Sequence, residues 1–183
     1  ATANAVANSG LMNYLNKFGY AAGYKGYDPV SELFYAAQRY MRGYALPDVY
    51  TNNLNAAGLD GFPVITGDAL TRGKSRDPMI NTCQKNFMLA IGDIYTHRDT
   101  NLPGSTIKTS DEPTTPASVD ADTAINVKTA TDMVGQLEGL SNLGSNRGPR
   151  NDSQFIAGLA YRLTERVFRA TDLAHQQFVV YRQ

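Results

Sequence analysis

Two carboxylates and one imidazole lie within seven residues of each other in the segment GDIYTHRD, at Asp93, His97 and Asp99. Carboxylate oxygens and imidazole nitrogens are common ligands of divalent cations, so this segment is a candidate site for calcium or magnesium, with Asp93 and Asp99 as metal ligands. The alternative is that Asp93 accepts hydrogen bonds from backbone N–H groups of the loop that follows it. The spacing alone leaves both interpretations open.

Hydrolysis by the same segment would need a nucleophile within reach of a base, and a third group that orients the base. The second histidine, His175, lies in a polar turn with no partner in the sequence pattern. The chain contains no Gly-x-Ser-x-Gly elbow, no complete Gly-x-x-x-x-Gly-Lys-Ser/Thr phosphate loop and no Cys-x-x-Cys pair. We therefore assign no catalytic residue and expect a non-enzymatic protein. The competing hypothesis is a cation-binding module or metal-dependent hydrolase that uses the loop of Asp93, His97 and Asp99.

A short apolar run, FMLAI at residues 87–91, positions this loop. It has no intervening charge and stops at a Gly-Asp pair, which predicts a central strand covered on both faces, as in parallel sheets. Open α/β sheets bind ligands at the carboxyl ends of their strands, where Asp93 would lie. The pattern therefore predicts an α/β core with its functional loop directly after this strand.

Helices are expected on either side of the strand, at residues 3–18, 29–43 and 131–140, with a further helix after residue 152 and a last strand at 177–181. In the second helix Asp28 is the expected N-cap, and Glu32 and Arg39 are expected to be solvated. Strand, helix and strand at the C-terminal end have an order compatible with a βαβ unit.

Two long segments rich in turn residues, 44–76 and 94–129, are expected to be irregular loop insertions. The first contains an edge-strand candidate at residues 62–66, and the second a short extended piece near residues 125–127. Since loops on a rigid scaffold often carry binding, the candidate binding residues lie in two loops. They are Asp93, Thr96, His97 and Asp99 after the strand, and Tyr20, Tyr24 and Tyr27 in a Gly/Tyr segment.

The composition excludes several classes of partner. Lys and Arg number 17, as do Asp and Glu, so the zero formal charge argues against nucleic acid or an anionic membrane as the main partner. No run of about 18 apolar residues exists to cross a bilayer. The chain also opens without a signal segment, and we expect it to be an excised piece of an exported protein. The single cysteine, Cys83, is either a buried thiol or pairs with a cysteine outside this piece.

The segment CQKNFMLAIGDIYTHRD followed by NLPG, at residues 83–104, resembles the central part of the PilY-type proteins of bacterial type IV pili. Further matching segments occur in the same order: YDPVSELFYAAQRYMRG, LDGFPV, VGQLEGL and FIAGLAY. The resemblance implies a von Willebrand A-like (Rossmann-like) sheet flanked by helices. The sequence departs from the metal-binding pattern of that fold, because it has no Asp-x-Ser-x-Ser loop and has Gly92, Asp93 and Ile94 in place of the usual Thr-Asp-Gly. The family's aspartate-arginine-proline turn near the end is also missing, so we expect an incomplete or atypical version.

The expected organisation is a single α/β domain over residues 1–183, a fragment of a larger exported protein. By resemblance, its role would be structural and binding, in pilus assembly and surface adhesion at the pilus tip. Its expected location is the cell surface, reached through the periplasm. The expected partners are minor pilins or other pilus components and an adhesion target.

Overall fold

The computed structural model describes residues 27–41, 44, 87–90, 95–148, 152–169 and 177–180, with the backbone alone for 163–169 and 177–180. The elements are the helices α2 (Val30–Met41), α4 (Ala117–Asp120), α5 (Val127–Leu137) and α6 (Phe155–Arg169), the 3-10 helix η4 (Leu143–Ser145), and the strands β1 (Phe87–Ala90) and β2 (Gln177–Val180). The helix predicted at 3–18, the strand predicted at 62–66 and almost all of the 44–76 segment lie outside the described residues.

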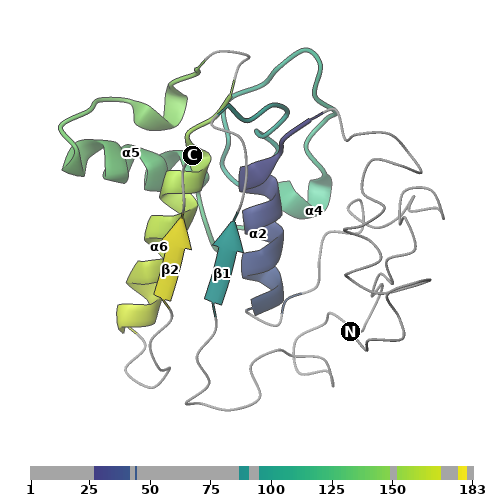
Figure 1. Cartoon of the computed structure of the whole chain (residues 1–183). Coiled ribbons are helices and arrows are strands. Elements are labelled where there is room, and N and C mark those ends of the chain that lie inside the picture. The colour runs from purple at the N-terminus through teal and green to yellow at the C-terminus, as the bar shows by residue number, and fades with distance from the viewer. Residues whose placement is uncertain are drawn as a thin grey trace, which may run out of the picture.

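The two described strands pair in parallel, with Phe87 opposite Gln177 and Ala90 opposite Val180. Both strand predictions and the βαβ-compatible order are confirmed. The arrowheads point to the end of the molecule where α2 and α6 begin, so the helices run opposite to the strands (Figure 1). The loop that follows β1 lies at that same end.

Exposure along β1 alternates, and this corrects one expectation. Phe87 is 61% exposed and Leu89 is 65% exposed, while Met88 packs against the core. Within the described part of the chain, the prediction of a strand covered on both faces is therefore wrong. Successive side chains of a strand point to opposite faces, and the described helices cover the face of Met88. β2 is the described neighbour of β1, so the larger von Willebrand A-like sheet stays an expectation.

Three helices form most of the packing around the core. α2 contacts α6 and β1, and α5 contacts α6. On α2, Phe34 is buried, as the apolar spacing predicts. Tyr35 is buried although that spacing does not include it, and Leu33, which the spacing places on the apolar face, is 70% exposed. Gln38 Nε2 donates to the carbonyl of Leu159 on α6 at 2.8 Å. The apolar core consists of Phe34, Tyr35, Leu102, Ile107, Val119, Ile125, Val127, Phe155 and Leu159.

α5 begins four residues before its predicted start and ends three before its predicted end. The early start is explained by Asn126, which adopts an extended backbone conformation and accepts a hydrogen bond from the N–H of Thr129 at 2.9 Å. A side-chain acceptor at this position satisfies one of the unpaired N–H groups of the first helical turn. Beyond the helix, Gly139 has a φ of 74°, a conformation that favours glycine after a helix end.

The segment predicted as the second insertion is built into the fold. Leu102, Ile107, Val119 and Ile125 all contribute to the core cluster, and α4 forms within the segment. Its predicted boundary at residue 129 lies inside α5. The segment contains few large apolar residues, but it is ordered because most of them are buried in the core.

Candidate functional site

Asp99 is the anchor of the loop after β1. Its side chain is buried with 0% exposure, and Oδ1 accepts from the N–H groups of Ser31 at 2.7 Å and Glu32 at 3.1 Å. Oδ2 accepts from the hydroxyl of Ser31. These N–H groups belong to the first turn of α2, which leaves them without partners inside the helix and favours a negative charge nearby. The capping carboxylate predicted at Asp28 is thus supplied by Asp99, from 68 residues away.

The same carboxylate reaches the start of α6. Ser153 Oγ lies 3.1 Å from the carbonyl oxygen of Asp99 and 3.2 Å from its Oδ2, and can donate to either. The hydroxyl also accepts from the N–H of Phe155, the first residue of α6, at 3.4 Å. Burial raises the pKa of Asp99 to about 6, and the hydrogen bonds from Ser31 and Glu32 oppose that rise. One residue therefore ties the loop to the beginnings of two helices.

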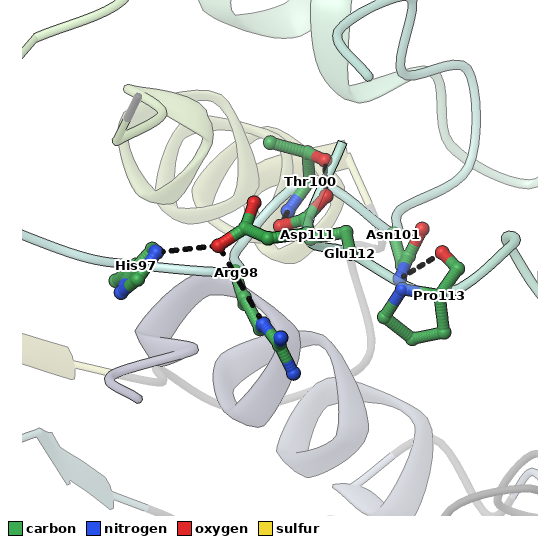
Figure 2. Close-up of polar contacts among 7 residues, drawn as sticks. All are labelled: His97, Arg98, Thr100, Asn101, Asp111, Glu112 and Pro113. Atoms are coloured by element: carbon green, nitrogen blue, oxygen red, sulfur yellow. Dashed lines mark hydrogen bonds and ion pairs between the residues drawn. The ribbon is translucent and has the colours of Figure 1, made fainter. Parts of the chain in front are cut away.

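The two arms of the loop are joined to each other at residues 100–101 and 112–113, here called the loop neck (Figure 2). The N–H of Thr100 donates to Glu112 Oε1 at 3.0 Å, and its hydroxyl donates to Oε2 of the same carboxylate. Asn101 Nδ2 donates to the carbonyl of Pro113 at 3.2 Å. These bonds close the loop into a fixed shape above the start of α2.

Glu32 and Arg39 are both engaged, so the prediction that they are solvated is wrong. The N–H of Asn101 donates to Glu32 Oε1 at 3.0 Å. Burial raises the pKa of Glu32 to about 8; the Asn101 bond lowers it, and the nearby carboxylates of Asp99 and Glu112 raise it further. Arg39 Nη1 lies 2.6 Å from Asp122 Oδ2, with the two side chains 19% and 10% exposed. Helical spacing alone could not show these partners, which come from residues 101 and 122.

Four side chains meet on the surface of the loop, and we call Tyr27, His97, Arg98 and Asp111 the loop cluster. His97 Nε2 lies 2.8 Å from Asp111 Oδ2, and the rings of His97 and Tyr27 pack edge to face with centroids 5.0 Å apart. The guanidinium of Arg98 lies 3.7 Å from the centre of the Tyr27 ring, and its Nε is 3.7 Å from Asp111 Oδ2. Figure 2 shows His97 and Arg98 both directed at Asp111. The hydrogen bond from His97 lowers the pKa of Asp111.

The sequence-predicted site residues fall into three groups. Tyr27 and His97 come together in the loop cluster. Thr96 and Asp99 are buried, at 7% and 0% exposure, and lie beneath that surface. The others, Asp93, Tyr20 and Tyr24, lie outside the described residues.

Sequence reasoning missed two members of the cluster. Arg98 adjoins His97 in the motif that was singled out, so the motif itself was the available signal. Asp111 lies 14 residues after His97 in a polar segment without periodicity, and nothing in the pattern connects the two. Their proximity depends on the closure of the loop neck.

The described residues do not support a metal site at Asp99. The carboxylate already accepts from Ser31, Glu32 and Ser153, while His97 is directed at Asp111. No group of three or more His, Cys, Asp and Glu side chains within the described ranges is arranged to hold a metal ion. A cation site at Asp93 stays a prediction.

A pocket of about 390 Å³ lies beside α2, away from the loop cluster. It is lined by Arg39, Tyr44, Ser118, Ala121, Asp122, Thr123 and Ala124. The Arg39–Asp122 ion pair forms part of its wall.

Among the helices that the structure describes, none has the length and apolar character needed to cross a bilayer.

Comparisons with known proteins give one consistent result. A family model described as "PilY1 homolog, second domain" matches residues 24–154. The "Type IV pilus biogenesis factor PilY1 homolog" of Xylella fastidiosa (strain Temecula1 / ATCC 700964) is 38% identical over an alignment of 176 residues, and the match covers 85% of this chain and 14% of that protein. The chain thus spans about one seventh of the length of this relative. No solved structure matches it.

Proposed function

The chain belongs to the family of PilY1 homologs, as the resemblance in its sequence predicted, and we propose that it serves type IV pilus biogenesis as a non-enzymatic structural and binding module. In this proposal it is part of an exported, tip-associated protein at the cell surface. Its partners are minor pilins or other pilus components, together with an adhesion target.

The observation that carries this proposal is the exposed loop cluster on a rigid support. Asp99 fixes the loop to α2 and α6, and the loop neck closes it, so the cluster is presented in one arrangement without a partner. Binding residues are commonly placed on loops that a rigid scaffold positions. A surface ordered in advance loses less conformational entropy on association, which favours a recognition role.

We further propose that β1 and β2 are two strands of a larger von Willebrand A-like sheet. The support is their parallel pairing, with helices that run opposite to the strands (Figure 1). A crystal structure of the chain tests this proposal directly. An antiparallel strand added directly beside β1 in place of the expected parallel neighbour would contradict it.

The proposed role is tested in the full-length parent protein, in a strain that lacks its own copy. The double variant Tyr27→Ala/His97→Ala removes much of the exposed loop cluster while leaving the Asp99 anchor unchanged. We expect fewer surface pili, measured by shearing and immunoblotting, and weaker attachment to surfaces. A matched double variant at exposed positions just after α5, Glu138→Ala/Ser141→Ala, should behave as wild type. Normal pili and normal attachment in the first variant, at wild-type protein levels, would refute the role assigned to this surface.

A further inference from the structure

Arg98 has a backbone conformation that is unusual for its residue type. Its φ is 56°, in the left-handed region, which is unfavourable for a non-glycine residue. On one side the N–H of His97 donates to the carbonyl of Asp28 at 3.4 Å, and on the other Asp99 is fixed by its buried contacts. Unfavourable backbone conformations held in place by their neighbours are concentrated at binding and catalytic sites.

The side chain of Arg98 is stacked on Tyr27, and within the described ranges its Nε donor has no hydrogen-bond partner. The guanidinium lies 3.7 Å from the centre of the Tyr27 ring, and the side chain is 31% exposed. The Asp111 oxygen is 3.7 Å from Nε, too far for a hydrogen bond, and the same oxygen lies 2.8 Å from His97 Nε2. Among the described residues, Arg98 Nε is buried without a hydrogen-bond partner. Stacking on an aromatic ring restrains the plane of the guanidinium and leaves its edge available.

A guanidinium restrained in this way has a definite chemical preference. The planar fork of N–H groups matches the two oxygens of a carboxylate and binds them through parallel charge-assisted hydrogen bonds. Resting on the proposed function as a binding module, we propose that Arg98, stacked on Tyr27 within the loop cluster, is the binding site for a carboxylate of a partner protein. The carboxylate comes from an acidic side chain or from a C-terminal residue.

The Asp111 carboxylate would repel an incoming carboxylate, and this repulsion allows a second, independent test. It carries the same charge as the ligand and lies 3.7 Å from the same guanidinium. Replacing Asp111 with Asn removes this repulsion while keeping the size of the side chain. The affinity for a carboxylate should then rise by about threefold, as Coulomb repulsion at a partly solvated site predicts.

The test uses the 183-residue chain labelled with ¹⁵N, and follows the Arg98 Nε–Hε signal by NMR during titration with three synthetic peptides. The first has Glu side chains and blocked ends, the second has Gly and Ser residues with a free C-terminal carboxylate, and the third is the second with its C-terminus amidated. We expect the first or the second to shift the signal, which identifies the source of the carboxylate, and the third to leave it unchanged. A shift by the third peptide, or none by the other two, overturns the proposal.

Three variants complete the test by fluorescence titration. Arg98→Lys keeps the charge but loses the fork and the stacking, and should weaken binding about tenfold. The matched control Arg147→Lys changes another exposed arginine, which donates to the carbonyl of Lys108, and should leave the affinity unchanged. Asp111→Asn should strengthen binding. Equal affinities for wild type and Arg98→Lys, with both chains folded by circular dichroism, overturn the proposal.

The same Arg98→Lys change in the full-length protein separates this inference from the proposed function. Loss of surface pili without carboxylate binding by the isolated chain would refute the carboxylate site and leave the binding module in place. Arg98-dependent carboxylate binding, with normal pili in every loop-cluster variant, would refute the role in pilus biogenesis and leave the site in place.

Discussion

At the scale of single residues, the buried carboxylate of Asp99 anchors the loop after β1. The carboxylate accepts hydrogen bonds from the N–H groups of Ser31 and Glu32 and lies within hydrogen-bond distance of the Ser153 hydroxyl. The sequence motif suggested a metal ligand. The structure shows that this buried carboxylate instead joins the loop to two helices. A buried donor without an acceptor costs more free energy than one hydrogen bond contributes, so the surrounding donors hold the carboxylate in place.

Substitution of Asp99 distinguishes an anchor from a ligand. Asp99→Ala leaves several buried donors without an acceptor and should lower the free energy of unfolding by about 3 kcal/mol. Asp99→Asn should cost about 1 kcal/mol, since Oδ1 of asparagine still accepts from Ser31 and Glu32. Urea denaturation of the chain measures both. The exposed control Asp120→Ala should stay within about 0.5 kcal/mol of wild type. Equal losses for all three variants would contradict the anchor role.

The raised pKa values of Glu32 and Asp99 predict an uncommon pH dependence. Burial raises the pKa of Glu32 to about 8 and the pKa of Asp99 to about 6, whereas the pKa values of unfolded Glu and Asp are near 4.3 and 3.9. Between about pH 4 and pH 8 the folded chain therefore binds more protons than the unfolded chain, and the free energy of unfolding falls as pH rises. Thermal unfolding at pH 5, 6.5 and 8 should show a steadily lower midpoint.

Glu32→Gln isolates the larger of the two shifts. Gln keeps an oxygen that can accept from the N–H of Asn101, and it does not ionise. The variant should have a flatter pH profile than wild type and should gain relative stability above pH 6. A wild-type midpoint that rises from pH 5 to pH 8, or a variant with an unchanged profile, would show that Glu32 is not buried as described.

At the scale of elements, close contact between α5 and α6 depends on one glycine. A Cβ added at Gly158 would lie 2.4 Å from Thr131 Oγ1 and 2.5 Å from the backbone nitrogen of the same residue. The helices can approach this closely because position 158 has no side chain. From sequence alone, a glycine inside a helix indicates only a weaker helix.

Helix propensity and packing predict opposite effects for Gly158→Ala. Propensity alone gives a gain of about 1 kcal/mol, whereas overpacking against a backbone atom costs roughly 1–3 kcal/mol. We expect packing to dominate and the free energy of unfolding to fall, as measured in urea. The neighbouring control Ala157→Gly should also lose about 1 kcal/mol, through propensity. A stabilised Gly158→Ala chain would mean that α5 and α6 are farther apart than described.

At the scale of the whole molecule, the long segment after β1 behaves as part of the core. Leu102 and Ile107 are 1% and 3% exposed, and the N–H groups of Thr100 and Asn101 donate to Glu112 and Glu32. Buried apolar contacts and paired backbone groups are the features that raise local stability. The loop should therefore open together with α2 and α6.

Hydrogen exchange measured by mass spectrometry tests this coupling. Peptides that cover residues 99–107 should be protected to a similar degree as peptides from α2, and Asp99→Ala should reduce protection in both. Exchange within seconds in the loop while α2 stays protected would show that the loop is an independent, mobile insertion.

The sequence by itself determined the local elements and the family. Apolar spacing predicted α2 and α6, the short runs FMLAI and QFVVY predicted the two strands, and ordered motifs indicated the PilY-type resemblance. These signals are local, because helix and strand periodicities depend on neighbours a few residues away. The motif around His97 also identified part of the candidate binding surface.

Only the tertiary structure decided which distant side chains meet. Asp99 receives its donors from residues 31, 32 and 153, and Asp111 reaches the loop cluster through closure of the loop neck. The exposed face of β1 likewise depends on where the helices pack. Charge pairing, burial and pKa depend on distances in space, which the order of residues along the chain does not contain.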